Sequence, residues 1–195
     1  GLLREQVDWE ELAAFERAKG SSTRVVGPNT PGIIVPGKTK IGIMPTRPFM
    51  PGPVAVLSRS GTLTYEVADR LTRAGIGQSI CVGIGGDPFI GVDFVDMFEM
   101  IRNHDQTRAV IILGEIGGQA EENLAEYVVR TGFDKPVISF IAGQTAPAGK
   151  RLGHAGAILE TGGGIQDKLT TMGKAGFAVC PSLEAVAEAT KKALE

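Results

Sequence analysis

The chain has 195 residues, of which 43% are hydrophobic and 22% are charged, and its formal net charge is −2 at pH 7. This composition argues against intrinsic disorder and indicates a globular protein that can bury a full core. The absence of a basic cluster argues against a nucleic-acid surface, and no apolar run is long enough to span a membrane. Cys81 and Cys180 each lie in an apolar run without metal-ligand spacing, which indicates buried thiols in a reducing compartment.

Residues 1–52 are expected to form a lead-in helix, a strand and a proline-rich connecting segment. Asp8, Trp9, Glu10 and Glu11 have the spacing of a capping box and predict the start of the helix. Residues 23–26 predict a short strand that runs into a fixed turn at 27–32. Residues 33–53 alternate short apolar pieces with prolines, which favours an ordered excursion, packed across an edge or a partner, over a regular element.

Residues 53–195 repeat the order strand, glycine-rich turn and helix, which is typical of a parallel doubly wound sheet. Strands are predicted at 54–57, 80–82, 109–113, 136–141 and 177–180. Helices are predicted at 62–74, across Phe94, Met97 and Ile101, and at 120–130, 166–174 and 183–194. We therefore expect one flavodoxin-like α/β domain with helices on both faces of the sheet, and ligands at the carboxyl ends of its strands.

The segment that sets His154 among small residues is the first candidate for chemistry. Glycine and alanine neighbours leave its imidazole accessible as a base, metal ligand or nucleophile, although a solvated loop histidine has the same surroundings. Glu115 lies between glycines at the end of a predicted strand. Its carboxylate can orient one imidazole nitrogen and leave the other nucleophilic, or it can simply face water. His104, the other histidine, lies at a polar helix end and is interpreted as structural.

A second candidate is an anion site where a predicted strand ends and a helix begins. Backbone N–H groups and hydroxyls converge there at the positive end of the helix dipole, and the residues involved are Ser58, Arg59, Ser60, Gly61 and Thr62. A helix N-cap is the alternative interpretation, and it is compatible with anion binding. Residues 162–164 are either another anion site or a plain loop. The glycine clusters at 83–86 and 143–150 lack the spacings of dinucleotide and P-loop sites, so no such site is assigned.

Five motifs in this order resemble the α subunits of succinyl-CoA synthetases. They are Gly27-Pro28-Asn29-Thr30-Pro31-Gly32, Ser58-Arg59-Ser60-Gly61-Thr62-Leu63-Thr64-Tyr65-Glu66, Val82-Gly83-Ile84-Gly85-Gly86-Asp87, Gly114-Glu115-Ile116-Gly117-Gly118 and Gly153-His154-Ala155-Gly156-Ala157. The resemblance covers the whole chain but corresponds to the carboxyl-terminal portion of that subunit. We therefore expect the family's amino-terminal, CoA-binding Rossmann domain to be absent.

The resemblance implies a role for each of these motifs. His154 matches the histidine that is phosphorylated during turnover, and Glu115 matches the glutamate that orients it. Residues 58–62 would open one of two helices whose N-termini hold the phosphohistidine, and the β subunit would supply the other. Tyr65 falls near the acid substrate. The place where substrate and the CoA thiol meet would be lined by Asn29, Thr30 and Pro31. Many members have cysteine where this chain has Thr30, so no thiol chemistry is assigned there.

The implied activity is that of an acid–thiol ligase, which forms acyl-CoA from a carboxylic acid, CoA and ATP or GTP. The triphosphate and its magnesium are expected on the partner β subunit, and a second αβ pair is a further expected partner. We assign no metal ligand to this chain and expect neither a nucleic acid nor a membrane as a partner. The expected location is the cytoplasm, or the mitochondrial matrix in a eukaryote.

Three alternatives stay open at this point. Malate–CoA ligase shares the histidine and Gly-Glu-Ile-Gly-Gly motifs. ATP-citrate lyase ranks lower because it typically interrupts the Ser-Gly-Thr-Leu-Thr-Tyr-Glu run, which is intact here. The third alternative belongs to a different class of protein and is a catalytically inactive flavodoxin-like binding or assembly module.

Overall fold

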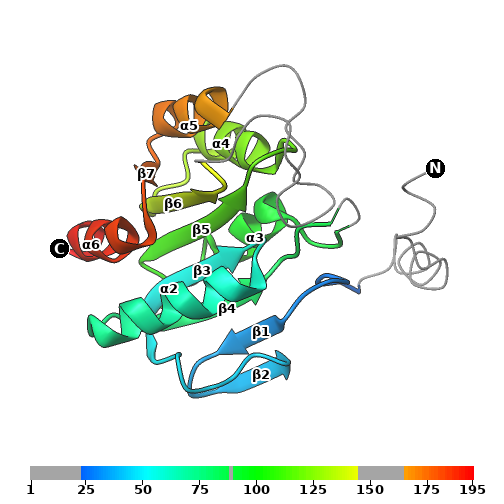
Figure 1. Cartoon of the computed structure of the whole chain (residues 1–195), viewed down its shortest axis with the longest axis vertical. Coiled ribbons are helices and arrows are strands. Elements are labelled where there is room, and N and C mark those ends of the chain that lie inside the picture. The colour runs from blue at the N-terminus through cyan, green and yellow to red at the C-terminus, as the bar shows by residue number, and fades with distance from the viewer. Residues whose placement is uncertain (1–22, 88–89, 145–164) are drawn as a thin grey trace.

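The computed structural model describes residues 23–87, 90–144 and 165–195 (Figure 1). Within them a seven-stranded sheet has the order β2-β1-β4-β3-β5-β6-β7. The strands are β1 (Gly32–Val35), β2 (Thr39–Gly42), β3 (Pro51–Ser58), β4 (Gln78–Gly83), β5 (Ala109–Glu115), β6 (Val137–Ala142) and β7 (Ala178–Cys180). The helices are α2 (Gly61–Arg73), α3 (Phe94–Ile101), α4 (Ala120–Thr131), α5 (Ile165–Lys174) and α6 (Leu183–Leu194).

Strands β4, β3, β5, β6 and β7 pair in parallel, and their order confirms the predicted flavodoxin-like doubly wound sheet. The chain begins this part of the sheet at β3, moves outward to β4, and then crosses to β5 on the other side of β3. The topological switch point therefore lies between β3 and β5. In open α/β sheets the ligand crevice lies outside the carboxyl ends of the strands at such a point.

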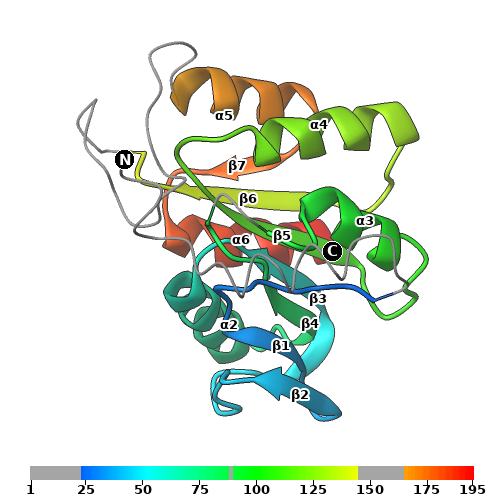
Figure 2. The ribbon, with the colours of Figure 1, turned by 90° about the vertical axis from the view of Figure 1, so that its right-hand side faces the viewer.

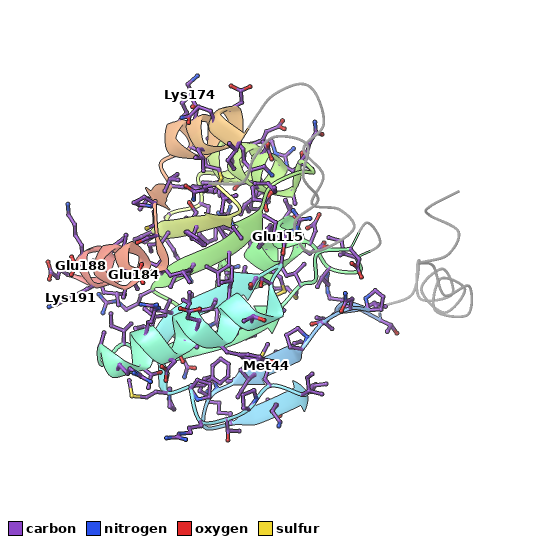
Figure 3. The ribbon with its side chains drawn as sticks, in the orientation of Figure 1. Met44, Glu115, Lys174, Glu184, Glu188 and Lys191 are labelled. Atoms are coloured by element: carbon purple, nitrogen blue, oxygen red, sulfur yellow. The ribbon has the colours of Figure 1, made fainter. Side chains whose placement is uncertain are left out.

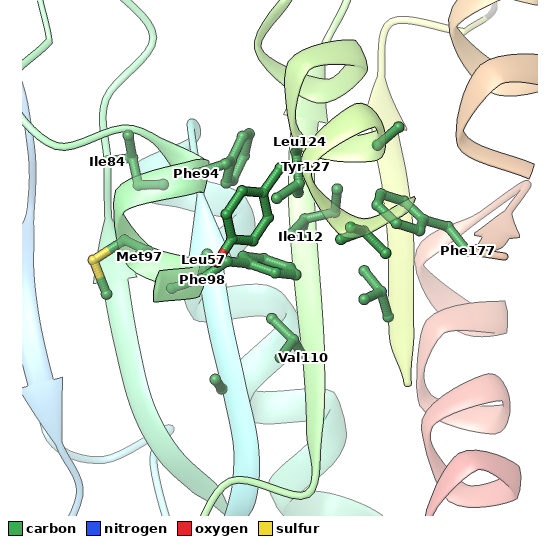
Figure 4. Close-up of a cluster of buried hydrophobic side chains, with 14 of the residues drawn as sticks. Leu57, Ile84, Phe94, Met97, Phe98, Val110, Ile112, Leu124, Tyr127 and Phe177 are labelled. Atoms are coloured by element: carbon green, nitrogen blue, oxygen red, sulfur yellow. The ribbon is translucent and has the colours of Figure 1, made fainter. Parts of the chain in front are cut away.

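Helices cover both faces of the sheet, as Figures 1 and 2 show. Alternate residues of β3 point to opposite faces, so Val54 and Val56 pack with α2 and α6 while Ala55 and Leu57 pack with α3 and α4. Figure 4 shows the second of these cores, in which aromatic rings from α3 and α4 lie over β3 and β5. Burial on both faces explains why the central strands read as continuous apolar runs in the sequence.

The two cysteines are buried, free thiols in separate strands, as the apolar runs around them indicated. Burial in apolar surroundings raises the pKa of the Cys81 thiol and that of the Cys180 thiol. Both thiols are therefore protonated and unreactive near neutral pH. In the described part of the chain, no helix combines the length and apolar character that a bilayer crossing requires.

The first part of the described chain corrects two of the predictions. Residues 33–53 do contain regular structure, because β1 and β2 form an antiparallel hairpin that joins the edge of the sheet beside β4. The prediction was wrong because it took the prolines as evidence against regular structure. They lie outside the two short strands of this hairpin and therefore do not interrupt its pairing. The prediction of a strand at 23–26 is wrong, because this segment joins no strand of the sheet. It makes isolated backbone hydrogen bonds, in which the carbonyl of Val25 accepts the N–H of Val92 and the carbonyl of the adjoining Gly27 accepts the N–H of Gly91. The predicted lead-in helix lies outside the described residues.

Candidate active site

Three strand ends meet at the carboxyl edge of the sheet. In the register of β3, Ser58 is paired with Gly83 of β4 on one side and with Leu113 of β5 on the other. Glu115 ends β5 and is paired with Ala142 of β6. Figure 3 shows the Glu115 side chain at this end of the sheet, near the start of α2. The two predicted site motifs, 58–62 and 114–118, therefore lie together at the switch point.

The 58–62 loop is held by its own serines. The buried Ser58 hydroxyl donates to the carbonyl oxygen of Ser60 at 2.7 Å and accepts the Ser60 N–H at 3.0 Å. The Ser60 side chain then accepts the N–H of Leu63 at 3.4 Å and caps α2. Gly61 and Thr62 open the helix, and its first N–H groups need acceptors from outside the helix. The first turn, fully described, has no acidic side chain to compete with an anion there.

Replacing Ser60 with alanine is expected to lower the free energy of unfolding by about 1 kcal/mol, because one N–H of α2 loses its acceptor. Ser182 is the matched control, since it caps α6 through the N–H of Ala185 at the same distance of 3.4 Å. Urea unfolding should give similar losses for Ser60→Ala and Ser182→Ala. If Ser60→Ala and Ser182→Ala had equal effects on anion binding, this result would contradict a special role of the N-terminus of α2 in binding anions.

Arg59 does not face the bulk solvent. Its guanidinium Nη1 contacts the Glu121 carboxylate at 3.3 Å and the Gly117 carbonyl at 3.4 Å. Glu121 also binds Lys168 of α5, and neither of these two residues was singled out from the sequence. A signal did exist, because Glu121 shares the buried face of α4 with Leu124, Ala125 and Val128 at helical spacing. A charged residue on an apolar face indicates a buried ion pair.

The loop that carries Asn29, Thr30 and Pro31 packs against the same edge. The Thr30 hydroxyl donates to the Gly83 carbonyl at 2.5 Å and accepts the N–H of Gly32 at 2.9 Å. A Cβ at Gly61 would lie 3.6 Å from the Pro31 ring, so this loop also contacts the start of α2. Asn29 is exposed. The structure therefore brings this loop to the 58–62 loop.

Tyr65 lies one turn further along α2 and is half-buried. Its ring packs edge-on against Phe49, with the centroids 6.4 Å apart. His104 lies beyond the end of α3, where its Nδ1 is 2.8 Å from the Thr107 hydroxyl. Among the residues that the structure describes, no group of three or more His, Cys, Asp and Glu side chains could hold a metal ion.

His154 lies within 145–164, outside the described residues, as do residues 162–164. The described flanks of this segment both border the 114–118 turn. On one side, a Cβ at Gly143 would lie 3.2 Å from Ile116, and on the other, Lys168 donates to the Gly118 carbonyl at 3.0 Å. Gly143 and Lys168, which lie on either side of the segment that carries His154, therefore both lie against the 114–118 turn.

A family model described as CoA-ligase matches residues 57–180. The chain belongs to the CoA-ligase family. It is 46% identical over 188 residues to the succinate–CoA ligase [ADP-forming] subunit alpha 1 of Archaeoglobus fulgidus, covering 96% of this chain and 64% of that subunit. It is 55% identical over 155 residues to the alpha subunit of Methanothermobacter thermautotrophicus, covering 80% of this chain and 52% of that subunit. These relatives confirm the resemblance to succinyl-CoA synthetase α subunits, and the chain spans between 52% and 64% of their length, which is less than two thirds.

Two solved structures share the fold. ATP citrate lyase of Methanosaeta concilii, in complex with (3S)-citryl-CoA, superimposes with a TM-score of 0.81 at 25% identity, covering 93% of this chain and 31% of the lyase. The dinucleotide-forming acetyl-coenzyme A synthetase 1 of Ca. Korarchaeum cryptofilum superimposes with a TM-score of 0.74 at 22% identity, covering 96% of this chain and 41% of the synthetase. The second likeness shows the fold alone.

Proposed function

We propose that this chain supplies the ligase domain of a succinyl-CoA synthetase α subunit, which acts with a β subunit to form succinyl-CoA. The observation that carries the proposal is the meeting of the 58–62 loop, Glu115 and the 29–31 loop at one edge of the sheet. This arrangement supports a site in which a helix terminus binds an anion while a carboxylate and a substrate loop lie at the same edge of the sheet. The identity to succinate–CoA ligase α subunits supports succinate as the acid substrate.

The proposed reaction runs in three steps. His154 attacks the terminal phosphorus of ATP or GTP held with magnesium by the β subunit, and the nucleoside diphosphate leaves. A succinate carboxylate oxygen then takes the phosphoryl group from the imidazole and becomes an acyl phosphate. Finally the CoA thiolate attacks the acyl carbon, and inorganic phosphate leaves. Neutral imidazole suits the carrier role because it is both a good nucleophile and a good leaving group.

The residues of this chain would act on the moving phosphoryl group and on its carrier. The N–H groups of Gly61 and Thr62 stabilise the phosphoryl oxygens where charge develops. The Glu115 carboxylate, 7% exposed, orients the imidazole of His154 so that its other nitrogen faces the phosphorus. The CoA and acid substrates would be received at Asn29, Thr30 and Pro31, with Tyr65 nearby.

Citrate cleavage is the second candidate, because the superposition with ATP citrate lyase covers 93% of this chain. Two observations favour the synthetase over the lyase. Identity to the lyase is 25%, against 46% to 55% for succinate–CoA ligase α subunits. The Ser-Gly-Thr-Leu-Thr-Tyr-Glu run is also intact. Succinate, malate and citrate offered in turn to the αβ complex would distinguish the synthetase, malate–CoA ligase and lyase activities.

The deciding experiment is phosphorylation of the chain by γ-labelled triphosphate in the presence of a succinate–CoA ligase β subunit. We expect an acid-labile, base-stable label that is lost in His154→Asn. His104→Asn is the matched control, because it removes the other histidine of the chain and the His104 ring bonds to Thr107, beyond the end of α3 and away from the strand ends. An unlabelled, folded and β-bound chain would favour the inactive module over the enzyme.

A further inference from the structure

The Glu121 carboxylate is completely buried in the first turn of α4 and receives donors from three other segments. Its Oε1 accepts the backbone N–H of Glu115 at 3.1 Å and lies 3.3 Å from Nη1 of Arg59. Its Oε2 accepts a hydrogen bond from Nζ of Lys168. Arg59 and Lys168 are themselves 8% and 4% exposed, so the whole cluster is withdrawn from water.

Each of the three donors belongs to a segment that borders the proposed phosphoryl site. Arg59 is part of the 58–62 loop, and Glu115 ends β5 at the switch point. Lys168 lies on α5, just after the segment that carries His154, and also donates to the Gly118 carbonyl at 3.0 Å. One carboxylate therefore joins the anion loop, the strand end and the helix that follows the histidine segment.

The backbone leaves space for this carboxylate. A Cβ at Gly114 would lie 2.4 Å from Oε1 of Glu121 and 2.8 Å from its Cγ. Only glycine at position 114 therefore allows the carboxylate to approach the end of β5 this closely. A buried carboxylate that is fully paired and seated against a glycine has a single well-defined position. This rigidity is what a group that orients reacting residues needs.

We propose that Glu121 is a positioning residue for phosphoryl transfer. It holds the 58–62 loop, Glu115 and α5 in one fixed arrangement without touching the phosphoryl group itself. The proposal rests on the proposed function, because it is the phosphohistidine chemistry that needs this arrangement. Loss of its charge leaves two buried cations without their shared carboxylate, and the loop and strand end that they connect then shift relative to each other.

The test compares Glu121→Gln with Glu122→Gln in the αβ complex. Glu122 is the matched control: it is the next residue, it also contacts Lys168, at 3.1 Å, and its side chain is 31% exposed. We expect Glu121→Gln to slow histidine phosphorylation in a single turnover by about tenfold or more, at an unchanged half-saturating triphosphate concentration. Glu122→Gln should stay within about twofold of the unmodified complex. A rate for Glu121→Gln equal to that of the unmodified complex would overturn the proposal.

A double variant separates positioning from stability. Glu121→Gln combined with Lys168→Gln removes a cation together with its carboxylate, so much of the lost thermal stability should return. The phosphorylation rate should nevertheless stay low, because the three segments are still not joined. Recovery of both stability and rate would show a structural role alone and overturn the proposal. The double variant also carries the test if Glu121→Gln by itself does not fold.

Amide hydrogen exchange at Glu115 distinguishes failure of this proposal from failure of the proposed function. If the unmodified complex takes up no label, the phosphohistidine function fails, and the exchange measurement then decides the role of Glu121. We expect exchange of the Glu115 amide to be faster by about tenfold or more in Glu121→Gln than in Glu122→Gln, because this N–H donates to the carboxylate. Equal exchange in the two variants would show that Glu121 does not hold the strand end.

Discussion

Gly83→Ala is expected to displace the 29–31 loop from the strand ends and to remove most of the proposed ligase activity. A Cβ at this position would lie 2.5 Å from Cδ of Pro31 and 2.9 Å from the Thr30 hydroxyl. Neither contact can be relieved by a flexible side chain, because one is a proline ring and the other is fixed by its hydrogen bond to the Gly83 carbonyl. The loop must therefore move as a unit, away from the end of β4.

Two measurements check this prediction. Overpacking should lower the free energy of unfolding by about 1–3 kcal/mol in urea. Succinyl-CoA formation by the αβ complex should fall by about a hundredfold, because a shift of about 1 Å at a positioned group has that effect. Gly173→Ala is the control, since nothing lies within 4 Å of the added Cβ and alanine favours the helix. Full activity of a folded Gly83→Ala complex would show that the 29–31 loop is not part of the site.

Phe98→Ala is expected to lower the free energy of unfolding by about 3–5 kcal/mol, the largest loss that we predict for a single core position. Phe98 is completely buried between α3 and the sheet (Figure 4), and its ring packs against Phe133 with the centroids 4.7 Å apart. Truncation removes this ring contact and leaves a cavity that helix α3 cannot close, because Phe94 and Met97 anchor the same helix.

The matched control for this cavity is Met100→Ala, on the same helix but 42% exposed. We expect that change to stay within about 0.5 kcal/mol. Urea unfolding followed by far-UV circular dichroism measures both variants, and the slope against urea should be the same for each. A loss for Phe98→Ala no larger than that for Met100→Ala would mean that α3 is not packed as described.

The parallel part of the fold was predictable from the sequence because its local signals agree with its tertiary surroundings. Each predicted strand of residues 53–195 is an apolar run that ends close to a turn residue or glycine, and each is present in the sheet. The edge hairpin was not predictable, because β2 is fully exposed and so lacks the alternation of buried and exposed residues that identifies a strand. Its place is decided by pairing with β1, and through β1 with β4.

Part of the candidate site was likewise predictable from the sequence, and part was not. The resemblance of five motifs predicted the family, and the relatives confirm it. The sequence by itself also singled out the 58–62 loop and Glu115, because glycine spacing and helix capping are local properties of the chain, and the roles of these residues stay predictions. Only the tertiary structure decided that Arg59 faces inward and that Glu121 and Lys168 join it. These partners are separated by 62 and 47 residues along the chain, and only the crossing of α4 and α5 over the strand ends brings their charges together. The position of Glu121 on the apolar face of α4 could indicate that this carboxylate is buried, but its partners depend on long-range packing and could not be named from the sequence.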